Sequence, residues 1–118
     1  MPTIPDDIAR STALRLAGEI DPALPALVEA QLQPGAPPRR FADPVTAGIA
    51  LAALIVTAAK TGWDIYRDVK KDGKDPPAPP VLERRLRIEL KIDPALPAAQ
   101  SQRAIAVVVE EIARQDER

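Results

Sequence analysis

The chain lacks three residue types altogether and has few aromatic side chains. Its 118 residues include no His, Cys or Asn, and only one Phe, one Trp and one Tyr. Without Cys there is no thiolate nucleophile, no disulfide framework and no zinc–thiolate site. Without His there is no side chain that ordinarily exchanges protons near neutral pH. Ser11 and Ser101 lie outside any nucleophile motif, so we predict no enzyme, no catalytic residues, no cofactor and no metal site.

An excess of charge of one sign is also missing. Sixteen Lys and Arg residues stand against 17 Asp and Glu residues, for a formal net charge of −1. This balance argues against nucleic-acid binding, which usually requires an excess of basic residues. The short basic run at 84–87 lies between two glutamates and forms only a small patch. The N-terminal residues show no basic cluster followed by an apolar run, so no secretory signal is expected. We predict a cytoplasmic protein, with a membrane location as the alternative.

A 13-residue segment at 14–26 returns in similar form 72 residues later, at 86–98. The last seven residues, Ile-Asp-Pro-Ala-Leu-Pro-Ala, are identical, and Leu-Arg precedes them at the same distance. Asp can cap a helix and Pro fits its first turn, so each copy predicts a helix start. We expect Leu24 and Leu96 to be buried anchors; the alternative is that both are exposed docking residues for a partner.

Proline-rich stretches divide the single domain predicted from this length. We assign a first repeat unit to 1–33, a linker to 34–43, a central helical segment to 44–72, a spacer to 73–80 and a second repeat unit to 81–118. Thr3, followed by Pro5 and two acids, is typical of a helix start. A second helix is expected to begin at Asp21-Pro22, so that the first unit is a helical pair.

The second repeat unit is less clear at residues 81–92. Apolar and charged side chains alternate from 86 to 92, which is a strand pattern. Arg, Glu, Leu and Lys prefer helices, however, and the first copy of the repeat predicts a helix. We therefore predict a mostly α fold, with a long central amphipathic helix (about 44–71) flanked by two related helical pairs. The alternative is an α+β fold, with 84–92, and also 12–20, as strands.

Residues 45–59 carry no charge and raise the question of a membrane span. Fifteen residues rise about 22 Å, short of the roughly 30 Å hydrocarbon core. Extension from Phe41 to Trp63 would span it, with an aromatic at each interface. On a helical wheel the polar side chains of 46–68 fall within about 120°, which favours an amphipathic helix in water. A small protein anchored in the membrane by residues 41–63 is the alternative.

The central helix would be about 42 Å long, with an apolar arc wider than the short flanking helices are expected to cover. Apolar positions from 45 to 66 also follow the 4-3 spacing of packed helices. We predict a non-enzymatic interaction and assembly module, self-associating through this helix as a homo-oligomer or binding another protein. The residues expected to carry the interaction are Ile49, Leu51, Ile55, Val56, Trp63, Tyr66, Leu24 and Leu96.

Two weaker motifs favour structural interpretations. Asp64, Asp68 and Asp72 are four residues apart, but lysines interleave with them, which predicts a solvated helix end rather than a cation site. Pro77 and Pro80 have the spacing of proline-rich ligands, although a stiff spacer is the commoner use of such a segment.

Overall fold

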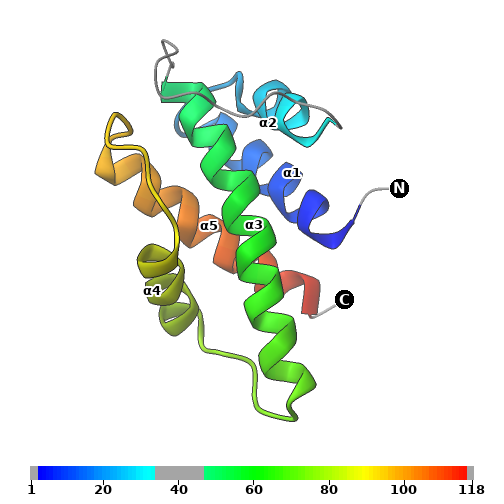
Figure 1. Cartoon of the computed structure of the whole chain (residues 1–118). Coiled ribbons are helices and arrows are strands. Elements are labelled where there is room, and N and C mark those ends of the chain that lie inside the picture. The colour runs from blue at the N-terminus through cyan, green and yellow to red at the C-terminus, as the bar shows by residue number, and fades with distance from the viewer. Residues whose placement is uncertain (1–2, 34–46, 117–118) are drawn as a thin grey trace.

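A computed structural model describes residues 3–33 and 47–116, and all regular structure in these ranges is helical (Figure 1). The helices are α1 (Ile4–Ala17), α2 (Leu24–Leu32), α3 (Ala47–Lys71), α4 (Pro79–Glu89) and α5 (Ala98–Asp116). The mostly α prediction is confirmed. The strand alternative is wrong, because both 12–17 and 84–89 are helical. The predicted linker 34–43, Phe41 and the first residues of the predicted central helix lie outside the described residues.

The start of α1 follows the predicted capping pattern. The Thr3 side-chain oxygen accepts the N–H of Asp6 at 3.3 Å, and Pro5 occupies the first turn. Asp6 and Asp7 lie near the positive end of the helix dipole, while Arg15 lies in the last turn. Each of these features stabilises a helix that begins at residue 4.

Both copies of the repeated Ile-Asp-Pro-Ala-Leu-Pro-Ala form the same turn before a helix. Asp21 Oδ1 accepts the N–H of Ala23 at 2.9 Å, and Asp93 Oδ1 accepts the N–H of Ala95 at 2.7 Å. The aspartate thus closes a turn rather than capping the helix directly, as Asp commonly does. For this reason α2 begins at Leu24, later than predicted.

Helix α4 settles the ambiguous segment. Leu82 and Leu86, four residues apart, are buried on one face, whereas Ile88 is exposed. The alternation from 86 to 92 therefore does not reflect a two-sided strand. Pro79 and Pro80 occupy the first helical positions, where no N–H is required, so the extended spacer ends at Ala78. Since Pro80 is helical, an extended ligand running from Pro77 to Pro80 does not exist in this fold.

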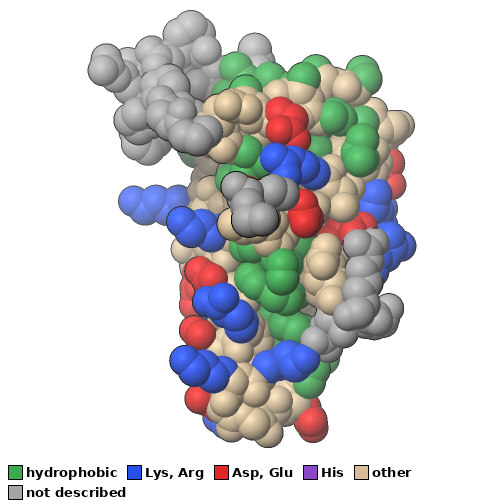
Figure 2. Space-filling model, turned by 90° about the vertical axis from the view of Figure 1, so that its right-hand side faces the viewer, with side chains coloured by type: hydrophobic (Ala, Val, Ile, Leu, Met, Phe, Trp, Pro, Cys, Tyr) green, Lys and Arg blue, Asp and Glu red, His purple; other side chains and the backbone are tan. Residues whose placement is uncertain are grey.

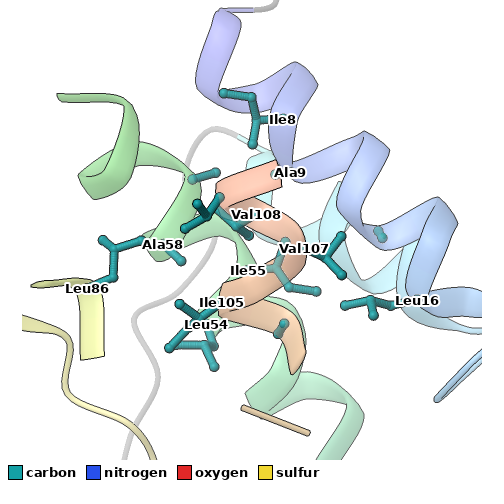
Figure 3. Packing of buried hydrophobic residues seen from close by; sticks show 14 of the residues in the cluster. Ile8, Ala9, Leu16, Leu54, Ile55, Ala58, Leu86, Ile105, Val107 and Val108 are labelled. Atoms are coloured by element: carbon teal, nitrogen blue, oxygen red, sulfur yellow. The ribbon is translucent and has the colours of Figure 1, made fainter. Parts of the chain in front are cut away.

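The core surrounds α3, which contacts the other four helices and extends beyond them at its C-terminal end (Figure 1). Figure 3 shows Ile55 of α3 among Leu16 of α1 and Ile105 and Val108 of α5. Gly62 allows α5 to approach α3 closely, because a Cβ at position 62 would lie 2.7 Å from the Ile112 side chain. Helix α3 ends at Lys71, and Gly73 just beyond it has a positive φ of 75°, which favours glycine.

Candidate interaction surface on the central helix

The eight predicted interaction residues fall into two groups. Five are buried within the chain: Leu24, Leu51 and Ile55 completely, and Tyr66 and Leu96 to within 5%. The other three, Ile49, Val56 and Trp63, are half-buried. The flanking helices therefore cover more of the apolar arc than the sequence predicts, because α1, α2, α4 and α5 all pack on α3.

The burial of Leu24 and Leu96 bears on the two interpretations of the repeat. An anchor must be buried in the chain, whereas a docking residue must be exposed. Leu24 is 0% exposed and Leu96 is 5% exposed, and both belong to the hydrophobic core. Their burial supports the anchor interpretation and removes both residues from the accessible surface.

The three half-buried residues are spaced by seven positions along α3. We call Ile49, Val56 and Trp63 the heptad ridge. A spacing of seven places side chains on nearly the same line of a helix. The alternate positions of the predicted 4-3 pattern, Ala52, Ala59 and Tyr66, are buried against the domain. One half of the pattern thus builds the core, and the other half is half-buried at its border.

Val56 and Trp63 line a groove of about 480 Å³ at the border of three helices. The start of α1, the end of α2 and the middle of α3 form its walls. Its remaining lining residues are Thr3, Ile4, Pro5, Asp6, Leu32, Lys60, Asp64 and Arg67. Figure 2 shows hydrophobic side chains near the middle of this face of the molecule, with Lys and Arg side chains beside them. The groove is mainly apolar at its base and charged at its edge.

Charges of both signs border the ridge. Lys60, Asp64 and Arg67 are exposed on α3, and Asp6 lies in the first turn of α1. Within residues 3–33 and 47–116, none of the four forms an ion pair. Two cations and two anions at the edge of one apolar groove give a surface without net charge, which neither attracts nor repels partners of one sign strongly.

Trp63 is held in place by a second aromatic residue. Its ring stacks on that of Tyr66, with centroids 5.8 Å apart and an angle of 16° between the planes. Lys70 Nζ lies 6.0 Å from the Tyr66 centroid. Tyr66 is itself 5% exposed, so the buried ring supports the half-buried one. The indole is therefore a rigid part of the groove.

The wall formed by α1 is fixed to its neighbours by arginine–carboxylate pairs. Arg10 Nε donates to Glu29 Oε1 of α2 at 2.5 Å, and this hydrogen bond raises the pKa of Arg10. Arg15 Nη1 donates to Glu111 Oε1 of α5 at 3.2 Å. Glu111 is 5% exposed, so this contact is partly shielded from water. These pairs hold the groove wall against the rest of the domain.

Nothing in the groove resembles a catalytic or metal-binding arrangement. The described residues contain no group of three or more Asp or Glu side chains that could hold a metal ion. One buried side-chain oxygen in these ranges, the Thr12 hydroxyl, has no hydrogen-bond partner. It belongs to α1 and does not line the groove. The predictions of no enzyme and no cofactor stay predictions.

The length of α3 keeps the membrane alternative open. Among the described residues, Gly48–Lys71 is long and apolar enough to cross a membrane, with a mean hydropathy of 1.3 in its most apolar window. Half of that window is buried inside the domain. The core helix of a water-soluble protein meets the same two criteria, so length and composition do not decide between them.

The sequence did not indicate which side of α3 is left open. Ile4 and Leu32, which line the groove, carry no signal of their own. The open side depends on where α1 begins and α2 ends relative to α3, which is a matter of tertiary packing.

A search for similar proteins found no matching family model, no matching curated protein and no matching solved structure.

Proposed function

We propose that this protein is a non-enzymatic interaction module that associates with a second copy of itself through the heptad ridge of α3. The observation that carries the proposal is the regular spacing of the three half-buried residues. Ile49, Val56 and Trp63 follow the seven-residue period of packed helices. Trp is the residue most enriched among side chains that dominate binding energy at protein interfaces.

The spacing of the ridge suits a two-fold symmetric pair. In an antiparallel arrangement centred on Val56, Ile49 of each copy lies opposite Trp63 of the other. The same patch then serves both partners, as in most homodimers.

The residue inventory supports a role in binding rather than catalysis. The chain has no His and no Cys. The ionisable groups that line the groove are Asp6, Lys60, Asp64 and Arg67, and all lie at its charged edge on α1 or α3. A rigid aromatic side chain beside complementary charges is typical of a protein interface.

Self-association can be tested without damage to the core. Leu51→Asp is unsuitable, because Leu51 is 0% exposed and a buried charge would unfold the domain. Trp63→Ser removes the half-buried aromatic of the ridge, and we expect a dimer seen by analytical ultracentrifugation at high micromolar concentration to become a monomer. Leu14→Ser, at an exposed leucine of α1, is the matched control and should leave the dimer intact.

Charges introduced at the centre of the ridge test this pairing. Val56→Asp should abolish self-association, because acids then face acids across the two-fold axis; Val56→Lys should do the same with bases. Mixed in equal amounts, the two variants should associate with each other. A wild-type chain that stays monomeric at high micromolar concentration, or variants that fail to associate when mixed, would contradict the proposal.

A single-pass or membrane-associated protein, anchored by residues 41–63, is the second candidate. It is favoured by the length and hydropathy of α3. Insertion would require the domain to open, because half of the apolar window is packed against other helices. Sedimentation with membranes that resists alkaline carbonate would support this candidate over self-association.

A further inference from the structure

Helix α4 presents an apolar and basic face that no other part of the described chain covers. It packs on α5 and α3 through Leu82 and Leu86 and has no contact with α1 or α2. In Figure 1 it lies at the edge of the domain beside α5. On the side opposite these leucines, Val81 is 57% exposed and Ile88 is 78% exposed. These two residues are seven apart and share one line of the helix.

Basic side chains surround this aliphatic pair. Arg84 lies between Val81 and Ile88 on the helix surface, and Lys91 follows just after the helix. Neither forms an ion pair with another described residue. Arg85 and Arg87 lie at the borders of the face and pair within the helix with Glu89 and Glu83. Residues 79–91 contain four basic and two acidic residues, so they carry a charge of +2.

We propose that this face of α4 binds the surface of an anionic lipid bilayer, with Val81 and Ile88 inserted among the headgroups and Arg84, with Lys91, against lipid phosphates. A single convex helix gives a peptide little to dock into: neither Val81 nor Ile88 lines the groove beside the heptad ridge or the two pockets that Tyr66 lines. It does match a planar surface, where exposed aliphatic and basic side chains act together.

A second copy of this chain fits the face poorly. Two such faces would oppose arginine to arginine, since the acids of α4 lie toward its packed side and are already paired. The heptad ridge is on α3, so lipid binding by this face of α4 does not depend on self-association. An acidic segment of another protein is the competing occupant, and the experiment below distinguishes it.

The test is sedimentation of the full chain with vesicles. We expect binding to phosphatidylcholine vesicles that contain phosphatidylserine, little binding to pure phosphatidylcholine, and weaker binding as salt rises. Arg84→Gln should weaken binding about five-fold, the equivalent of about 1 kcal/mol per basic residue at the surface. Val81→Ser with Ile88→Ser should reduce it further. All three residues are exposed, so circular dichroism should show unchanged folding.

Two matched controls show whether α4 is the surface that binds. Leu14→Ser removes an exposed leucine of α1, and Arg114→Gln removes an exposed arginine of α5; neither should weaken vesicle binding. Failure to bind anionic vesicles would overturn the proposal, as would binding that survives the Val81/Ile88 double variant. If vesicles fail but polyglutamate binds and Arg84→Gln weakens that binding, the face belongs to an acidic protein partner instead.

Discussion

The two copies of the repeat share a turn but bury opposite faces of the helix before it. Residues 14–26 and 86–98 both close an aspartate turn and bury the leucine that follows. In the preceding helices the pattern is inverted. Leu14 is 67% exposed, whereas its counterpart Leu86 is buried; Leu16 is buried, whereas its counterpart Ile88 is 78% exposed.

This difference separates what is encoded locally from what is decided by packing. The turn needs an aspartate and a neighbouring N–H, which both copies of Asp-Pro-Ala-Leu supply. The buried face depends on the partners. Helix α1 packs on α2, α3 and α5, whereas α4 packs on α3 and α5 only. Two segments that share nine of 13 residues can therefore present different surfaces, and the exposed side of α4 is available for binding.

The largest expected effect comes from the helix positions at which burial differs between the two copies. Leu16→Ala and Leu86→Ala should each lower the free energy of unfolding by about 2–5 kcal/mol, because both side chains are fully buried. Leu14→Ala and Ile88→Ala, at the equivalent exposed positions, should change it by less than about 0.5 kcal/mol. Urea denaturation of the four variants measures this. Equal losses at Leu14 and Leu86 would mean that the copies pack alike.

The shared anchors should respond alike. Leu24→Ala and Leu96→Ala remove buried side chains that follow the same turn, so each should destabilise the domain by about 2–4 kcal/mol. Ala23→Ser and Ala95→Ser, at exposed neighbouring positions, are the controls and should have little effect. An unchanged melting temperature for either leucine variant would favour the docking interpretation for that copy.

A smaller effect is expected from the turn carboxylates. Asp21→Ala and Asp93→Ala each remove an acceptor for a backbone N–H, and each should cost about 1 kcal/mol. Asn retains a side-chain acceptor, so Asp21→Asn and Asp93→Asn should recover part of the loss. A cost confined to one copy would show that the two turns differ in spite of their common hydrogen bond.

These contrasts also show how far sequence could predict the molecule. The helix start at Thr3, the stop at Gly73 and the turn leucines all follow from local chemistry, and each was predictable. The exposed faces were not predictable. The alternation at Leu86 and Ile88 resembles a strand in the sequence, and only the packing of α4 on α5 shows which side of a helix is buried. For the same reason the sequence predicted interaction residues across the whole apolar arc of α3, including Leu51 and Ile55, which the flanking helices bury.

The smallest effect concerns an ion pair that only the first copy makes. Glu19 accepts two hydrogen bonds from Arg103 of α5, at 2.9 and 2.8 Å, and these bonds lower its pKa. The equivalent residue of the second copy is Lys91. A lowered pKa in the folded state stabilises the protein above the usual Glu pKa, and that contribution disappears as pH falls through the lowered value.

Glu19→Gln should therefore lower the melting temperature slightly near neutral pH, by less than the turn variants do. The two proteins should converge in acid, once Glu19 of the wild type is protonated. Melting curves at several pH values make the comparison. A difference that persists unchanged below the lowered pKa would show that the effect comes from something other than the carboxylate charge.

The heptad ridge is tested most directly by a distance between copies. The chain has no Cys, so Thr57→Cys places one spin label at the exposed border of α3 and Ile88→Cys places one on α4. Pulsed electron paramagnetic resonance at high micromolar concentration should give a short, well-defined distance between labels at position 57 and none so short at position 88. A short distance at position 88 alone, or none at either position, would contradict association through the ridge.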